Sequence, residues 1–144
     1  VVSYGGGFPS PEMVWEKVKA ECDGVVLPYC YTAHGHQKLY RTHFPSKLPE
    51  YLALGMPVII SGPAYATGVK WGLQNPDACL AITEQWGVPW VEALTRLRTD
   101  AQLRLRLSSG AVAAGNRDFD PAAICSAFVR ALRAAANART VERK

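Results

Sequence analysis

Ser46, Lys47 and Glu50 lie at the start of a predicted helix and are the residues best suited to bind a ligand. Ser46 suits the N-cap position, because its hydroxyl can accept a hydrogen bond from a first-turn amide. Free amides and the positive end of the helix dipole favour an anion there. The chain before this helix adds further cations, which are Lys38, Arg41 and His43. This pattern predicts an anionic ligand; the alternative is an ordinary capped helix with a solvated lysine.

The predicted helix is short, and a buried strand follows it. Leu48, Tyr51, Leu52 and Gly55 are spaced to share one helix face. Gly55 can adopt the left-handed conformation that ends a helix. The unbroken β-branched run at 58–60 is typical of a strand covered on both faces. The sequence therefore predicts a loop, a two-turn helix and a buried strand in succession.

Other segments predict an α/β fold with a parallel sheet and helices on both sides. Ligands of such sheets bind beyond the carboxyl ends of the strands. The predicted strands are Val1–Tyr4, Val25–Leu27, Val58–Ile60 and Ala78–Ile82, with a loop over Tyr29–Pro45. Helices are expected after Ser10, over Tyr65–Leu73 and over Trp90–Leu97, with Trp86–Pro89 as a turn. Two more should follow caps at Thr99 or Asp100 and at Asp120, with apolar faces at Leu103, Leu107, Ala111, Ala114 and at Ile124, Phe128, Ala131, Leu132, Ala135.

The segment Asp23–Tyr29, followed by a long loop and Phe44–Ile59, resembles the sugar-donor domain of GT-B-fold glycosyltransferases. Among these enzymes, the chain most resembles the group 1 family, whose members use nucleotide-diphosphate sugars as donors. The order of elements matches from Val1 to about Ala136, and the specific part is the core Pro-Ser-Lys-x-x-Glu-Tyr-x-x-x-Gly-x-Pro-Val. The resemblance implies a Rossmann-like three-layer domain, the C-terminal half of a donor domain, followed by C-terminal helices. It covers residues 1–136, and 137–144 would form a polar tail.

The resemblance also implies roles for residues around this core. The diphosphate would bind at Pro45, Ser46, Lys47 and Leu48. Glu50 would accept hydrogen bonds from the ribose hydroxyls; the alternative is a carboxylate that stabilises the helix dipole. Many family members carry a second glutamate eight positions earlier, near the donor sugar, where this chain has Thr42. Either Thr42 or His43 contacts the donor sugar, or this chain does not need an acidic residue there. The identity of the catalytic residue is therefore left open.

A wider set of residues is assigned to the base or sugar pocket, namely Gly7, Phe8, His34, His36, Arg41 and Phe44. Gly7 and Phe8 follow the first strand and would contact the nucleobase, unless they form only a flexible turn. His34 and His36 would line the donor-sugar or acceptor pocket, or lie in a plain mobile loop. With no cysteine or acidic partner nearby they do not make a zinc site, so no metal is expected.

The implied reaction moves a sugar from a nucleotide-diphosphate sugar to an unknown acceptor, with retention of anomeric configuration and without metal or cofactor. The acceptor would be held by an N-terminal domain that this chain lacks, so this part alone would be inactive. The full-length enzyme could associate peripherally with a membrane. Two alternatives remain open: a non-catalytic nucleotide-binding or interaction module of the same fold, and a nucleotide-sugar epimerase.

Composition limits the classes of protein. The chain has 144 residues, 49% of them hydrophobic and 19% charged, as in one globular domain. The net charge of +4 suits an anionic small ligand or surface but is too small to argue for nucleic acid. Val1 is not a start methionine, so we expect part of a longer polypeptide. Without a signal peptide or a spanning apolar run, it is expected to be cytoplasmic. The cysteines, expected reduced and moderately buried, are Cys22, Cys30, Cys79 and Cys125.

Overall fold

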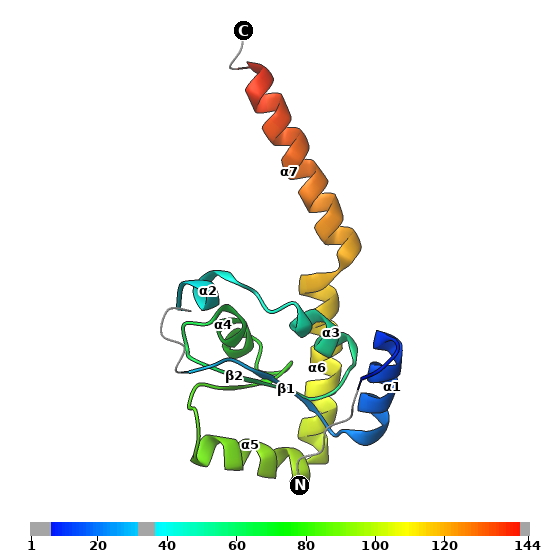
Figure 1. The fold of residues 1–144 in the computed structure, drawn as a ribbon, viewed down its shortest axis with the longest axis vertical. Coiled ribbons are helices and arrows are strands. Elements are labelled where there is room, and N and C mark those ends of the chain that lie inside the picture. The colour runs from blue at the N-terminus through cyan, green and yellow to red at the C-terminus, as the bar shows by residue number, and fades with distance from the viewer. Residues whose placement is uncertain (1–6, 32–36, 142–144) are drawn as a thin grey trace.

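The computed structural model describes residues 7–31 and 37–141 of the chain (Figure 1). It is an α/β structure with a small parallel sheet. The strands are β1 (Val25–Pro28), β2 (Val58–Ser61) and β3 (Leu80–Ile82). The helices are α1 (Pro11–Glu21), α2 (Gln37–Thr42), α3 (Lys47–Ala53), α4 (Thr67–Gln74), α5 (Val88–Thr99), α6 (Ala101–Phe119) and α7 (Pro121–Val141).

The sheet has the order β1-β2-β3, and both pairings are parallel. Val25 faces Val58 across the first pair, and Ile59 faces Leu80 across the second. All four residues of the central strand β2 are buried. This confirms the prediction of a strand covered on both faces, which is why its sequence does not alternate between apolar and polar residues.

Two apolar clusters lie on opposite faces of the sheet, because successive strand residues point to opposite sides. In the larger cluster Leu48 and Leu52 of α3 pack with Ile60 of β2. In the smaller cluster Ile59 of β2 packs with Ala93 of α5. Leu48 and Leu52 are fully buried. Burial of such a side chain stabilises by about 1.5–3 kcal/mol, so this face of α3 anchors the helix that carries the predicted site.

Helix α3 ends where predicted, and α6 has the predicted cap and buried face. Gly55 follows α3 with a φ of 65°, a left-handed conformation that other residues rarely adopt. The Asp100 carboxylate accepts the Leu103 amide over 2.8 Å and caps α6. The buried residues of α6 are the four predicted from its periodicity, Leu103, Leu107, Ala111 and Ala114.

Several boundaries differ from the prediction. The loop expected over Tyr29–Pro45 contains α2. Helix α4 begins two residues later than predicted, at Thr67. The turn expected at Trp86–Pro89 is shorter, because α5 already starts at Val88 with Pro89 in its first turn, where a missing amide costs nothing. The strand expected at Val1–Tyr4 lies outside the described residues.

Helix α7 extends away from the rest of the structure (Figure 1). Its predicted apolar face is present but exposed: Ile124 is 52% exposed, Phe128 62% and Leu132 55%. The helix runs to Val141, so it continues into the segment expected to form a polar tail. Among residues 7–31 and 37–141, no helix combines the length and apolar character needed to cross a membrane.

The expectation of moderately buried cysteines is wrong for three of the four. Cys22, Cys30 and Cys125 are exposed, and Cys79 is buried. Cys22 follows the last residue of α1, a helix with no buried residue, and Cys125 lies on the projecting α7. Cys79 lies directly before β3 and belongs to the larger apolar cluster. Burial raises the pKa of its thiol to about 12, so it stays protonated and unreactive at neutral pH.

Candidate functional site

The start of α3 differs from the predicted capped helix. Ser46 has φ −60° and ψ −24°, so its backbone is already helical, and its side chain makes no capping hydrogen bond. The Leu48 amide donates to the Pro45 carbonyl over 3.1 Å, because the chain turns one residue earlier than expected. Pro49 has no amide. Of the first three residues of α3, only Lys47 can therefore offer an amide to a ligand.

Lys47 and Glu50 form a pair on the surface of α3. The Lys47 ammonium donates to Glu50 Oε2 over 2.9 Å, and both side chains remain partly exposed, at 56% and 40%. The same ammonium lies 5.3 Å from the centre of the Trp15 ring. The structure thus brings two predicted ligand-binding residues into contact and leaves both accessible.

Trp15 is a member of this cluster that the sequence analysis missed. Its ring meets Tyr51 edge-on, with centroids 6.4 Å apart, so α1 and α3 contact each other beside the Lys47–Glu50 pair. The available signal was the position of Trp15 three residues before Val18, which places both on one face of α1. We call Trp15, Lys47, Glu50 and Tyr51 the α1–α3 cluster.

Two residues assigned to the ligand, Leu48 and Phe44, pack on the core. Leu48 is fully buried, and its amide is used by Pro45, so the diphosphate role predicted for it is not supported by this geometry. Phe44 is half-buried, and its ring centre lies 5.3 Å from that of Phe119. Phe119 in turn contacts Trp71, which joins the end of α6 to α4. The side chains of Leu48 and Phe44 therefore hold α3 and its preceding segment on the core.

Thr42 and His43 are exposed at the end of α2. The Thr42 hydroxyl donates to the Lys38 carbonyl over 2.9 Å, a bond within its own helix. The His43 amide donates to the Leu39 carbonyl over 2.6 Å, and the His43 carbonyl accepts from the Thr67 hydroxyl. The backbone at His43 is thus held by α2 and α4, while its exposed imidazole is the better placed of the two candidates to meet a ligand.

The basic residues before α3 do not all converge on its start. The Arg41 guanidinium lies 5.0 Å from the centre of the Tyr65 ring, next to α4, whereas Lys47 lies over Trp15. Figure 1 shows α2 and α1 on opposite sides of α3. Arg41 and Lys47 therefore contact different rings in different parts of the molecule.

The predicted base contacts lie before α1. Gly7 is exposed, and a β-carbon added to it would meet no atom within 4 Å. The Phe8 ring lies 5.6 Å from the Lys17 ammonium. His34 and His36 lie outside the described residues. Within the described residues, no three or more histidine, cysteine or acidic side chains gather as metal ligands would.

Two tyrosines occupy the carboxyl ends of the strands. The Tyr31 hydroxyl lies 3.0 Å from Ser61 Oγ and 3.1 Å and 2.9 Å from the carbonyl oxygens of Ile82 and Glu84. The Tyr29 hydroxyl accepts the Gly68 amide over 3.1 Å, and burial raises the pKa of Tyr29. Tyr31 thus links the segment after β1 to the ends of β2 and β3. Both tyrosines lie in the segment expected to be a loop, and no sequence pattern predicted this role.

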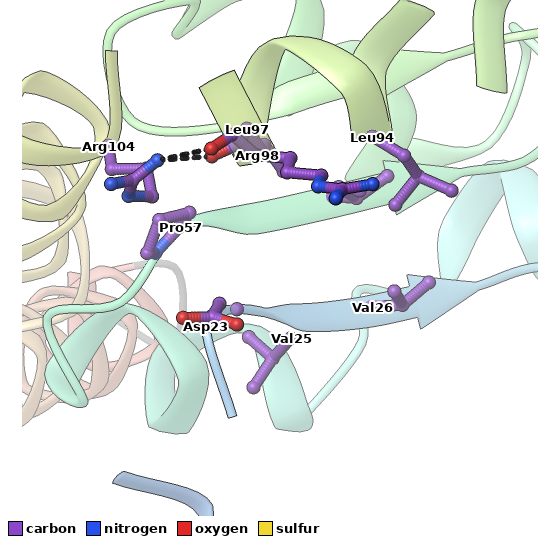
Figure 2. A pocket seen from close by; sticks show the side chains of 10 residues that line it. Asp23, Val25, Val26, Pro57, Leu94, Leu97, Arg98 and Arg104 are labelled. Carbon is purple, nitrogen blue, oxygen red and sulfur yellow. Dashed lines mark hydrogen bonds between the residues drawn. The ribbon is translucent and has the colours of Figure 1, made fainter. Parts of the chain in front are cut away.

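A cavity of about 470 Å³ lies at the opposite edge of the sheet, beside the first residues of β1 and β2 (Figure 2). Val26, Ile59 and Leu94 form part of its apolar wall. At one end Arg104 donates to the carbonyls of Leu97 and Arg98 over 2.6 Å and 3.2 Å, which stabilises the C-terminus of α5. This cavity is a partly uncovered sheet face, far from the carboxyl ends where ligands of parallel sheets bind. This cavity and three others among the described residues are lined by residues other than Ser46, Lys47 and Glu50.

These features define an α/β protein with a three-stranded parallel sheet and an exposed cation–carboxylate–aromatic cluster between α1 and α3. Comparison with protein-family models, with curated proteins and with solved structures found no match to this chain.

Proposed function

We propose that this chain is part of the nucleotide-sugar donor domain of a group 1 GT-B glycosyltransferase, with a Rossmann-like three-layer architecture over residues 1–136. The observation that carries the proposal is the contact between Lys47 and Glu50 on the exposed start of α3. These are the residues that the family resemblance assigns to the diphosphate and to the ribose. The order of strands and helices around them supports the same assignment.

The chemistry of the two side chains fits this role. An ammonium group binds diphosphate oxygens and stabilises the negative charge that develops on a leaving nucleoside diphosphate. A carboxylate accepts hydrogen bonds from ribose hydroxyls. An exposed ion pair contributes only about 0–1 kcal/mol, so a diphosphate can replace Glu50 as the partner of Lys47 at little cost. Glu50 is then released toward the ribose.

The proposed reaction is transfer of the sugar to an acceptor with retention of configuration and without metal. The acceptor is held by a separate N-terminal domain, so this chain alone is inactive. The proposed location is the cytoplasm, with the full-length enzyme peripheral to a membrane. The candidates for a residue that contacts the donor sugar remain Thr42 and His43, of which His43 has the exposed ring.

A second candidate function is a non-catalytic nucleotide-binding module of the same fold. The observation that favours it is Thr42, which stands where many family members carry an acid. Its hydroxyl is bonded within α2. Such a module would bind the nucleotide through Lys47 and Glu50 without turning over a sugar donor.

Calorimetric titration of the chain with UDP, GDP and ADP tests the binding step. We expect weak binding of at least one of them, which weakens further as salt rises, because a charged contact supplies much of the free energy. Absence of heat with all three at millimolar concentration would contradict the proposal. Hydrolysis or transfer assays on the full-length protein then separate an enzyme from a binding module.

A further inference from the structure

Trp15 of α1 packs against α3 rather than into the core of the protein. Helix α1 has no buried residue, and neither of the two apolar clusters includes Trp15. The side chain is nevertheless partly buried, because it lies against Tyr51 and the Lys47 side chain. Contacts with the surface of α3, rather than burial in the core, therefore fix the position of Trp15.

Tyr51 orients the indole ring of Trp15. The two rings meet edge-on, at an interplanar angle of 84° and with centroids 6.4 Å apart, an arrangement that aromatic pairs prefer. Tyr51 itself packs against the larger apolar cluster, so the core holds Tyr51 and Tyr51 holds the indole. An aromatic side chain has only two torsions, so little conformational freedom is lost when it is fixed. The indole is thus a rigid surface beside the start of α3.

The indole in turn limits where the Lys47 ammonium can lie. The ammonium is 5.3 Å from the ring centre and 2.9 Å from Glu50 Oε2, so contacts from two helices act on one cation. A flexible lysine side chain loses conformational entropy when a ligand fixes it, and a side chain that is already held loses less. The ammonium has three N–H donors, of which Glu50 accepts one. Donors therefore remain for the oxygens of an anion.

We propose that Trp15 is a positioning residue, whose ring holds the Lys47 ammonium where it binds the phosphate oxygens of a diphosphate group. The face of an aromatic ring attracts a cation without neutralising its charge. The contact with Trp15 therefore remains when a diphosphate replaces Glu50 as the partner of Lys47. The assignment of this diphosphate to a nucleotide rests on the proposed function, whereas the effect of Trp15 on Lys47 does not.

Calorimetric titration of the 144-residue chain with pyrophosphate and with UDP, GDP and ADP tests this role. Trp15→Leu keeps an apolar contact with Tyr51 but has no aromatic face. It should weaken binding about two- to fivefold, the scale of an exposed cation–π contact. Trp15→Phe restores an aromatic face and should recover part of the loss. Proton NMR without ligand tests the position directly, because the ring shields the ε-methylene protons of Lys47. This shielding should disappear in Trp15→Leu and persist in Trp15→Phe.

Trp86→Leu is the matched control, because Trp86 is 78% exposed and lies outside the α1–α3 cluster, so the affinity should not change. Circular dichroism confirms that each variant remains folded. Unchanged affinity in Trp15→Leu, or Lys47 protons that are not shielded in the wild type, overturns the positioning role. Binding of pyrophosphate that depends on Trp15, without binding of any of the three nucleotides, supports the positioning role and contradicts the proposed function. Absence of binding by pyrophosphate and by all three nucleotides overturns both.

Discussion

The Lys47 ammonium donates a hydrogen bond to Glu50 Oε2 over 2.9 Å, across one turn of α3. Trp15 of α1 lies under the same ammonium at 5.3 Å. Because the pair is exposed, it adds little to stability. Its position beside the contact between two helices instead keeps a cation and a carboxylate side by side on the surface, where we propose that the nucleotide binds.

Replacing Lys47 with alanine should weaken binding of a nucleoside diphosphate by roughly 1–3 kcal/mol, the scale of a hydrogen bond to a charged group. Calorimetry at low salt measures the loss. Lys19→Ala is the control, since Lys19 is an exposed lysine of α1 outside the α1–α3 cluster. Equal losses in the two variants would show that only the net charge matters and that Lys47 has no specific role.

In the full-length protein, Glu50→Gln should lower kcat/KM for the sugar nucleotide while the melting temperature changes little. The amide keeps the shape of the side chain but loses the charge, and charge-assisted hydrogen bonds are about twice as strong as neutral ones. Loss of the exposed pair with Lys47 should cost at most about 1 kcal/mol of unfolding free energy. Steady-state kinetics and thermal unfolding on the same preparation test this. Normal kinetics together with much easier unfolding would make Glu50 a structural residue.

Gly110 of α6 lies against the segment before β3. A β-carbon at this position would stand 2.0 Å from the Asp77 carbonyl oxygen, so the backbone must shift to accept it. Gly110→Ala should therefore lower the unfolding free energy by about 1–3 kcal/mol, the usual cost of overpacking. Urea unfolding followed by circular dichroism measures it.

Gly115→Ala in the same helix is the matched comparison for Gly110. Its β-carbon would meet the Leu52 side chain at 3.3 Å, a contact that small movements relieve, and alanine favours the helix by about 1 kcal/mol. We expect a change close to zero. Equal destabilisation at both positions would show that the approach of α6 to Asp77 is not the cause.

Asp118 should make the stability depend on acid pH. The Arg117 guanidinium donates to both carboxylate oxygens over 2.7 Å and the Trp71 indole donates over 2.9 Å. The hydrogen bond from Arg117 has the largest effect and lowers the pKa of Asp118, and the bond from Trp71 also lowers it. Because the pKa of Asp118 is lower in the folded state than in the unfolded state, its ionised carboxylate stabilises the fold. This stabilisation is complete at pH values above the unfolded-state pKa and is lost as the pH falls through the folded-state pKa.

Thermal unfolding between about pH 2 and pH 5, which covers the ordinary aspartate pKa and the range below it, tests this dependence. Asp118→Asn should flatten the decline of the melting temperature at acid pH. Asp77→Asn should keep the wild-type slope, because Asp77 is exposed and its contact with Arg106 is longer, at 3.5 Å. A wild-type slope in Asp118→Asn would remove Asp118 as a source of the acid dependence.

Much of the secondary structure could be predicted because it depends on local patterns. The β-branched run of β2, the four buried positions of α6 and the stop at Gly55 each follow from residues close together in the chain. The contact between Lys47 and Glu50 also has a local cause, since residues three apart on a helix are neighbours. These features needed no knowledge of the fold.

The tertiary structure decided the surroundings of the candidate site. Trp15 reaches Lys47 from a separate helix, and Tyr31 meets Ser61 and Ile82 across strand ends, so no sequence spacing predicts either contact. Ser46 suited an N-cap by type, but its backbone conformation follows from how Pro45 and Leu48 turn onto the core. The sequence by itself thus determined most of the strands and helices, although not α2, and which residue types stand at the start of α3. Which of those side chains meet was decided by packing, because contacts between distant segments depend on how their buried faces fit together.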